Sequence, residues 1–392
     1  MHSDTAVPQG FLVHTAPVGI EDDGRDDLCL IVSEVPARTA AVFTRSRFAG
    51  PSVTLSRAAA ADGLARGVVV IARNANVATG AQGAANAVTV RDAAARAAGI
   101  DPEELLIAST GVIGRQYPLE RISGHLEGLA WPPAADGARD MGTAARAIMT
   151  TDTRAKVLSV RIGDATLTGI AKGVGMLEPD MATLLTFFVT DAELDGETLT
   201  AVFKRTMDVT FNAVSIDTDT STSDSAALFA NGLAGPVDPA AFEEALHTVA
   251  LGLVKMIASD GEGASTLIQV EVTGARDTAQ AKRVGKAVVN SPLVKTAVHG
   301  ADPNWGRVVM AVGKCQDDVD IVPENVAVRF GDIGVYPPGA DEDERRETVA
   351  AYLKAHEEVV IGVDLGIGEG RFTVYGCDLT EGYVRLNSQY TT

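Results

Sequence analysis

Apolar and polar positions along the chain fall into short runs that predict strands and wider repeats that predict helices. Runs rich in aliphatic and β-branched residues predict strands at 28–32, 40–44, 67–71, 105–108, 267–272, 326–330, 359–363 and 372–375. Composition and pattern predict helices at 83–98, 118–130, 138–149 and 341–356. Two more helices are predicted from apolar faces, one with Leu199, Val202, Phe203 and Met207, the other with Phe242, Leu246, Val249, Leu253 and Met256. The mixture indicates a layered α/β protein.

Residues 172–188 form the stretch around which the chain is organised. The string Lys172-Gly173-Val174-Gly175-Met176-Leu177-Glu178-Pro179-Asp180-Met181-Ala182-Thr183 precedes the apolar run 184–188. The glycines and Pro179 predict a loop, and the β-branched and aromatic residues after Thr183 predict a buried strand. Taken alone, this is a turn before a core strand, with Thr183 at the joint. The Walker spacing is missing around Lys172, which argues against nucleotide binding.

Five other polar segments stand out, and each has a structural interpretation as a turn or cap. Asp238 and Pro239 are a suitable N-cap and first-turn pair for the second of the two amphipathic helices, which the glycines around Glu262 end. Glu262 is either a solvated turn carboxylate or a ligand-facing acid. The aspartates of 211–224 invite a calcium site, but the EF-hand spacing and its glutamate are missing. The other segments are Arg73-Asn74-Ala75-Asn76-Val77-Ala78-Thr79-Gly80, Ser109-Thr110-Gly111-Val112-Ile113-Gly114 and Met149-Thr150-Thr151-Asp152-Thr153.

Together these strings closely resemble the ornithine acetyltransferase family, and the resemblance covers nearly the whole chain. It is closest to the members associated with clavulanic-acid biosynthesis. It implies a layered αββα-type sandwich of the ornithine acetyltransferase/DmpA-like class with an additional smaller α/β domain. It also implies autocatalytic cleavage between Ala182 and Thr183. The expected parts are therefore an α fragment of residues 1–182, the start of a β fragment at 183–264, and a further α/β unit at 265–392.

The resemblance also implies roles for individual residues. Thr183 is expected to be the acyl-carrying nucleophile, and Thr110 and Gly111 the oxyanion hole. Substrate contacts are expected from Thr150, Lys172, Thr183, Glu262, Asn387 and Thr392, the last two in a C-terminus ordered in the site. Two departures bear on this transfer: Thr218 replaces a glycine common in the family, and Ser265 and Thr266 stand where many members have a lysine shortly after the glutamate motif.

Chemistry supplies a reason for the cleavage. A threonine hydroxyl is a weak nucleophile that needs an adjacent base. The α-amine released by cleavage has a reference pKa of roughly 8 and can act as that base. An N-to-O acyl shift from Ala182 to the Thr183 hydroxyl is our hypothesis for the cleavage step.

Composition narrows the class of protein. The 392 residues allow two or three packed domains, and the net charge of -19 argues against non-specific binding to nucleic acid or anionic membranes. The 3 cysteines are far apart and suggest neither a disulfide framework nor a thiolate zinc site. No apolar run approaches the roughly 20 residues of a membrane span. A cytoplasmic, soluble protein is expected, and the family resemblance implies that no metal or organic cofactor is required.

The implied activity is transfer of acetyl from N2-acetyl-L-ornithine to L-glutamate through acetyl-Thr183. An amidase or aminopeptidase that gives the acyl-threonine to water is the alternative, and a binding protein with a relic site is a third interpretation. The implied partners are the two cleaved fragments, held as a heterodimer that dimerises at least once, to a heterotetramer or larger. His299 lies in another string shared with the family, and a structural role is favoured for it.

Overall fold

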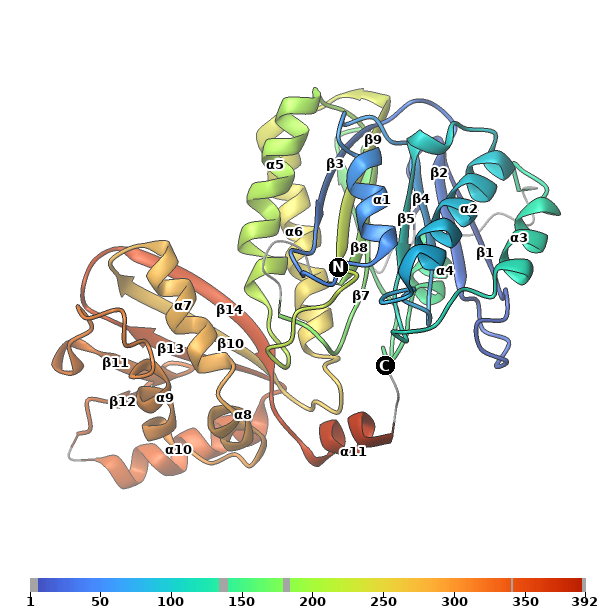
Figure 1. The fold of residues 1–392 in the computed structure, drawn as a ribbon. Coiled ribbons are helices and arrows are strands. Elements are labelled where there is room, and N and C mark those ends of the chain that lie inside the picture. Colours follow the sequence, from blue (N-terminus) through green and yellow to red (C-terminus); the bar gives the residue numbers. More distant parts are fainter. Residues whose placement is uncertain (1–5, 134–139, 179–183, 340, 390–392) are drawn as a thin grey trace.

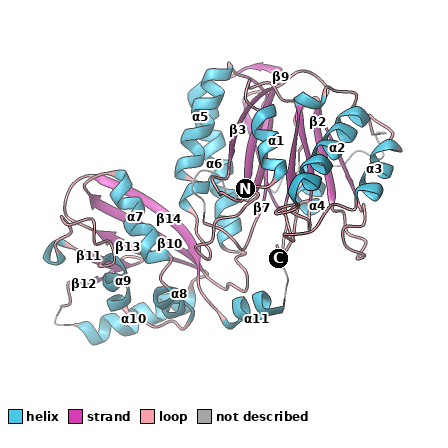
Figure 2. Cartoon of the chain, viewed as in Figure 1, coloured by secondary structure: helices cyan, strands magenta, loops and turns pink. Residues whose placement is uncertain are grey.

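The computed structural model describes residues 6–133, 140–178, 184–339 and 341–389. These residues form a larger unit with two sheets and a smaller unit built on a third sheet (Figure 1). Helices cover the outer sides of the larger unit and pack on the third sheet of the smaller one (Figure 2). None of the helices in the described ranges combines the length and apolar character that crossing a membrane requires.

The first sheet of the larger unit has the strand order β1-β2-β4-β5. β4 and β5 pair in parallel, and the other neighbours pair antiparallel. All residues of β2, β4 and β5 are buried, because both faces of this sheet are covered. Its strands are β1 (Phe11–Ala16), β2 (Leu28–Ser33), β4 (Gly67–Ile71) and β5 (Leu105–Ser109).

The second sheet has the order β3-β9-β8-β7-β6. β8 pairs in parallel with β9, and the other neighbours are antiparallel. β8 is the strand that the apolar run after residue 183 predicts. β9 was not predicted, since alanine, glycine and polar residues make up much of it. The strands are β3 (Arg38–Phe43), β6 (Lys156–Ile162), β7 (Ala165–Lys172), β8 (Leu185–Glu193) and β9 (Ser225–Pro236).

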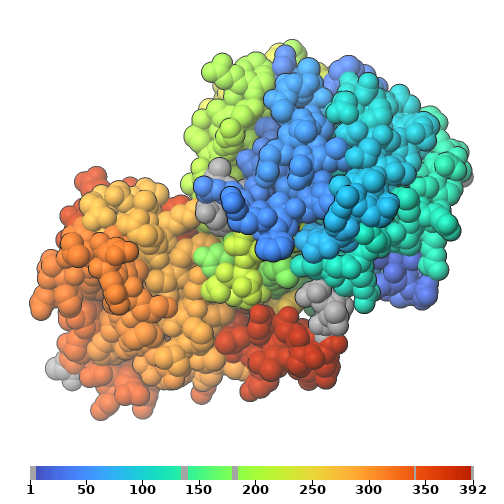
Figure 3. Space-filling view, viewed as in Figure 1, coloured from blue at the N-terminus to red at the C-terminus, as the bar shows by residue number. Residues whose placement is uncertain are grey.

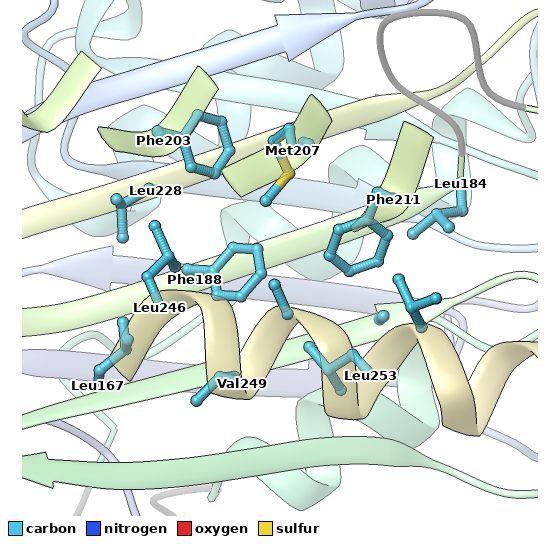
Figure 4. Packing of buried hydrophobic residues seen from close by; sticks show 14 of the residues in the cluster. Leu167, Leu184, Phe188, Phe203, Met207, Phe211, Leu228, Leu246, Val249 and Leu253 are labelled. Atoms are coloured by element: carbon cyan, nitrogen blue, oxygen red, sulfur yellow. The ribbon is translucent and has the colours of Figure 1, made fainter. Parts of the chain in front are cut away.

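The two sheets pack face to face and helices cover both outer faces. One apolar cluster joins the inner faces, with Val68 and Leu106 from the first sheet and Phe187 and Phe229 from the second. α2 and α3 cover the first sheet, and α5 and α6 cover the second, where Phe188 packs between them (Figure 4). The predicted αββα sandwich is confirmed. Its helices are α1 (Pro51–Ala59), α2 (Gly80–Ala98), α3 (Leu119–Glu127), α4 (Met141–Ala147), α5 (Gly196–Val209) and α6 (Pro239–Ala258).

α6 begins and ends as its sequence predicts. The Asp238 side chain accepts a hydrogen bond of 2.9 Å from Ala241 N, and Pro239 occupies the first turn. The helix ends at Ala258, just before the Asp260-Gly261-Glu262 turn. The end of α6 therefore delivers Glu262 to one end of the sandwich.

The smaller unit has a sheet of order β12-β11-β13-β10-β14 and its own apolar core. β10 lies between β13, which is parallel to it, and β14, which is antiparallel. Its strands are β10 (Leu267–Ala275), β11 (Ala327–Phe330), β12 (Ile333–Tyr336), β13 (Glu358–Asp364) and β14 (Gly370–Cys377). Its helices are α7 (Thr278–Val289), α8 (Pro292–His299), α9 (Trp305–Val312) and α10 (Glu342–Ala355). The larger unit also contains two short 3-10 turns, η1 (Pro102–Glu104) and η2 (Phe211–Ala213), and the smaller unit contains one, η3 (Pro323–Asn325).

α11 (Glu381–Gln389) follows β14 and returns the chain to the larger unit. In the space-filling view it lies between the smaller unit and the lower edge of the larger one (Figure 3). Its start is packed tightly, because a Cβ on Gly263 would come within 2.4 Å of Tyr383 N. α11 thus closes one side of the site described next.

Candidate active site

A pocket of about 220 Å³ opens where β7 ends and β8 begins, and loops of the larger unit line it together with α11. Six of the predicted site residues line it together: Thr110, Gly111, Thr150, Lys172, Glu262 and Asn387. Ala182, Thr183 and Thr392 lie outside the described residues. Leu184, the residue after the predicted nucleophile, also lines this pocket.

Leu184 is held firmly at the entry to β8. Its side chain is buried in the outer core near Phe211 (Figure 4). Its N–H donates a hydrogen bond of 2.6 Å to Asp224 Oδ1, and its carbonyl accepts one of 2.9 Å from Ser225 N. Its φ of +76° is in the left-handed region, an uncommon conformation for a branched residue that tends to occur at functional sites.

Thr110 and Gly111 follow β5 and reach the pocket from the first sheet. Thr110 N–H donates to Ile71 O at 3.0 Å, so this amide is already used. Gly111 has a φ of +122°, and a Cβ there would come within 2.3 Å of the Arg73 Cα. Only glycine fits at this position. If an oxyanion is held here, its donors are the Thr110 hydroxyl and the Gly111 N–H.

Lys172 ends β7 and reaches across to the first sheet. Its side chain is buried, and Nζ donates to Thr110 Oγ1 at 3.0 Å. Burial lowers the pKa of Lys172 below the ordinary lysine value, and the nearby Asp152 carboxylate only partly opposes this. Lys172 is therefore an amine with a lowered pKa, kept from water beside the predicted oxyanion hole.

A buried charge network holds Thr150 and Thr151 in place. Lys156 is fully buried, and its Nζ lies 2.7 Å from Asp152 Oδ1 and 2.6 Å from Asp260 Oδ2. Asp152 also accepts hydrogen bonds from Gly173 N at 2.9 Å and Thr150 N at 3.2 Å. Burial would raise the pKa of Asp152, but the positive charges of Lys172 and Lys156 outweigh burial and lower it.

The roles of Lys156 and Asp260 in this network were missed by sequence reasoning. Lys156 is the first residue of β6 and pairs with a carboxylate 104 positions away. Nothing local to either residue signals that contact. The sequence did indicate the hydroxyl cluster of residues 149–153. The network fixes the backbone of this cluster, because Asp152 accepts Thr150 N–H and Asp260 accepts Thr153 N–H.

Glu262 is the point where three segments of the pocket meet. Its Oε1 accepts a hydrogen bond of 2.9 Å from the Thr151 hydroxyl, and its Oε2 accepts one of 2.7 Å from Asn387 Nδ2. Its backbone N–H donates to Val174 O at 2.9 Å. Gly175 leaves room for it, since a Cβ there would lie 2.6 Å from the Glu262 carboxyl carbon. Glu262 thus lines the pocket, and its role as a ligand-facing acid stays a prediction.

Two aspartates of residues 211–224, Asp217 and Asp224, bind backbone amides. Asp217 accepts from Met176 N at 2.7 Å and from Leu177 N at 2.8 Å, which fixes the glycine-rich loop. Among the described residues, no three His, Cys, Asp or Glu side chains are grouped so as to hold a metal. Thr218 has a φ of +71°, so the turn keeps a conformation that favours glycine although the glycine is replaced.

Asp224 was not singled out by sequence reasoning. It is buried at the start of β9, and burial raises its pKa to about 7 despite the hydrogen bond from Leu184 N–H. With Asp217 and Glu262 it makes the pocket lining acidic overall, opposed by Lys172. Such a lining suits a substrate that carries an ammonium group.

His299 lies outside this pocket. Its Nδ1 is 3.1 Å from Asp378 Oδ2, which also accepts a hydrogen bond from the Ser265 hydroxyl. Asp378 Oδ1 in turn accepts from Ser265 N and Thr266 N. The contacts of His299 are those of a structural residue. The two residues that replace the family's lysine thus help to attach β10 to the end of β14.

The fold and the pocket define a layered αββα sandwich whose candidate active site lies where β8 begins and is closed on one side by α11. A family model described as the ArgJ family matches residues 12–392, so the chain belongs to the ArgJ family. The chain is 68% identical to glutamate N-acetyltransferase Oat2 of Streptomyces clavuligerus, covering 100% of this chain and 99% of that protein. It is 54% identical to the arginine biosynthesis bifunctional protein ArgJ of Rhodococcoides fascians, over 99% of this chain and 95% of that one.

Solved structures include an arginine biosynthesis bifunctional protein ArgJ from Bacillus halodurans. It is 41% identical, the match covers 51% of this chain and 96% of that chain, and the TM-score is 0.47. An ornithine acetyltransferase from Mycobacterium tuberculosis, solved in complex with ornithine, is 27% identical over 46% of this chain and 98% of that chain, with a TM-score of 0.39.

Proposed function

We propose that this chain transfers an acetyl group from N2-acetyl-L-ornithine to L-glutamate, using Thr183 as the nucleophile after cleavage between Ala182 and Thr183. The observation that carries the proposal is the meeting of Thr110, Gly111, Lys172 and Glu262 in one pocket where β8 begins. The full-length similarity to a glutamate N-acetyltransferase supports it. The pathway we assign is amino-acid biosynthesis, either of arginine or of a secondary metabolite such as clavulanic acid.

The proposed reaction has two halves. The Thr183 hydroxyl attacks the acetyl carbonyl, and its α-amine takes the hydroxyl proton. The carbonyl oxygen becomes negative and accepts hydrogen bonds from the Thr110 hydroxyl and the Gly111 N–H. The C–N bond breaks, the proton passes to the leaving amine, and ornithine departs. Glutamate then attacks the acetyl ester through its amine and restores the free Thr183 hydroxyl.

Substrate binding in this proposal uses the charges of the pocket. The Glu262 carboxylate pairs with an ammonium group of ornithine, and Asn387 keeps that carboxylate oriented through its hydrogen bond. Thr150 and Thr392 complete the substrate contacts. Lys172 donates to Thr110 Oγ1, which leaves the hydroxyl hydrogen of Thr110 free for the oxyanion.

The assembly and location belong to the same proposal. Fragments 1–182 and 183–392 stay associated as a heterodimer, which pairs into a heterotetramer or a larger assembly. The extensive packing between β7 and β8 would hold the fragments together, because the cut falls between these two paired strands. The three free cysteines fit the reducing cytoplasm.

Intact mass of the denatured protein beside its Thr183→Ala variant tests the cleavage. We expect two wild-type fragments, the second beginning at Thr183, and one uncut chain for the variant. The cleaved enzyme should then form acetyl-glutamate from N2-acetyl-L-ornithine and glutamate. Release of free acetate at the same rate with and without glutamate would identify a hydrolase instead. A single uncut wild-type chain would overturn the mechanism.

A further inference from the structure

Asp224 is a buried carboxyl beside the proposed cleavage junction, because it is hydrogen-bonded to Leu184, the residue that follows Thr183. Its Oδ1 accepts the Leu184 N–H at 2.6 Å, and that nitrogen is covalently bonded to the carbonyl carbon of residue 183. Its Oδ2 is also buried and has no hydrogen-bond partner of normal geometry within the described ranges, although the Ser221 side chain is near enough to lower the pKa of Asp224. A buried carboxylate oxygen left without a partner is costly and needs an explanation.

The surroundings hold Asp224 in one position. Its backbone carbonyl accepts a hydrogen bond of 3.0 Å from Thr44 N, and the next residue, Ser225, donates to Leu184 O at 2.9 Å. Asp224 is therefore fixed between the residue that follows β3 and the entry to β8. With only 1% of its surface exposed, Asp224 cannot move into solvent without opening this junction.

Self-cleavage needs a base other than the Thr183 α-amine, which serves as the base in the proposed mechanism of the cleaved enzyme. Before cleavage the nitrogen of Thr183 is part of an amide, so no α-amine exists to take the hydroxyl proton. We propose that Asp224 is the general base for self-cleavage, accepting the Thr183 hydroxyl proton in the uncut chain. This inference rests on the proposed function, because it assumes that Thr183 is the residue that attacks.

The proposed step balances with water as the co-reactant. The Asp224 carboxylate takes the hydroxyl proton, and the Thr183 oxygen bonds to the Ala182 carbonyl carbon. The C–N bond between Ala182 and Thr183 breaks, and the nitrogen takes the proton from Asp224. Water then hydrolyses the resulting ester, which releases the Ala182 carboxylate and returns the Thr183 hydroxyl.

Charge and burial suit Asp224 to this role. Burial raises its pKa to about 7, near the value at which a base both binds and releases a proton readily. Hydrogen bonds from Leu184 N–H and from the Ser221 side chain act against burial and lower the pKa of Asp224, and Lys172 on β7 adds a smaller effect in the same direction. Lys172 is the alternative candidate for the base. We favour Asp224, because Lys172 Nζ is already engaged in a hydrogen bond to Thr110 Oγ1.

The test compares Asp224→Asn with a matched control, Asp191→Asn. Asp191 is also a buried carboxylate, lies near the far end of β8, and accepts Thr166 N at 2.6 Å and Gln9 N at 2.9 Å. The asparagine at 224 retains an oxygen for the Leu184 N–H but cannot act as a base. The readout is the time course of cleavage of the full chain during cell-free translation, followed by intact mass below and above pH 7.

We expect Asp224→Asn to cleave at least about 100-fold more slowly than wild type, while Asp191→Asn cleaves at the wild-type rate. Wild-type cleavage should slow as the pH falls below about 7, where Asp224 becomes protonated, and the residual rate of Asp224→Asn should lack that inflection. Circular dichroism of the uncut Asp224→Asn chain should match that of uncut Thr183→Ala.

Two results would overturn the inference alone. One is an Asp224→Asn chain that cleaves at the wild-type rate; the other is a loss of cleavage in Lys172→Met with none in Asp224→Asn. Failure of the proposed function looks different, since the wild-type chain itself would then remain uncut.

Discussion

Lys172 Nζ lies 3.0 Å from Thr110 Oγ1 and so connects the end of β7 to the end of β5. Lys172 Nζ is the donor, so the threonine oxygen is the acceptor and the hydroxyl hydrogen is left for another partner. The backbone N–H of Thr110 is already bonded to Ile71 O at 3.0 Å. The contribution of Thr110 to an oxyanion hole must therefore come from its side chain.

Removing that hydroxyl tests this conclusion. We expect Thr110→Val, which keeps the shape of the side chain, to lower kcat by about 10²- to 10³-fold with little change in KM, as for loss of one oxyanion donor. Thr110→Ser keeps the hydroxyl and should retain most activity. Steady-state kinetics of acetyl transfer to glutamate give both constants. A Val variant with nearly wild-type kcat would assign the role to other donors.

Gly175→Ala tests the position of Glu262. The new Cβ would lie 2.6 Å from the Glu262 carboxyl carbon, so this carboxylate must move away from Thr151 and Asn387. We expect KM for N2-acetyl-L-ornithine to rise about tenfold, a loss of about 1.4 kcal/mol of binding, with a smaller change in kcat.

Gly124→Ala in α3 is the matched control for that substitution. A Cβ at Gly124 has no neighbour within 4 Å, so kinetic constants should stay at wild-type values. An unchanged KM in Gly175→Ala would show that Glu262 does not carry the substrate's charge.

Thr218→Gly should stabilise the protein. Thr218 has a φ of +71°, a conformation that a β-branched residue adopts only at a cost, whereas glycine adopts it freely. Glycine also loses more chain entropy on folding, so we expect a net gain of up to about 1 kcal/mol in the free energy of unfolding. Chemical denaturation measures it. Thr218→Ala retains a Cβ and should gain much less; equal gains in both variants would rule out backbone strain as the cause.

Asp224→Asn should change stability in a manner that depends on pH. The folded-state pKa of about 7 lies above the reference value of 3.8, so ionising the buried carboxyl costs folding free energy progressively as the pH rises between these values. Above pH 7 we expect the variant to be more stable than the parent by roughly 1–4 kcal/mol, with little difference near pH 4.

The measurement should be made in the Thr183→Ala background, so that both chains are uncut and Thr183 chemistry plays no part. Thermal unfolding at the two pH values gives the comparison. The same gain at both pH values would mean that folding does not raise the pKa of Asp224.

Local sequence patterns predicted much of the fold. The expected strand at 67–71 coincides with β4, and the apolar face from Phe242 to Met256 lies on α6. These segments are decided by periodicity and by caps, which involve residues close in sequence. β1 and β9 were not predicted. β9 depends on pairing with β3 and β8 more than on the propensity of its own residues.

The sequence by itself determined the family, because long specific strings around Thr183, Thr110, Glu262 and the C-terminus occur together in one chain. It also determined which residue types reach the candidate site. Only the tertiary structure decided how they meet. The buried Asp152, Lys156 and Asp260 network and the contact between Asp224 and Leu184 join segments far apart in the chain. Burial there also sets the pKa of Asp224, and burial is a property of the packed fold that no local pattern of residues specifies.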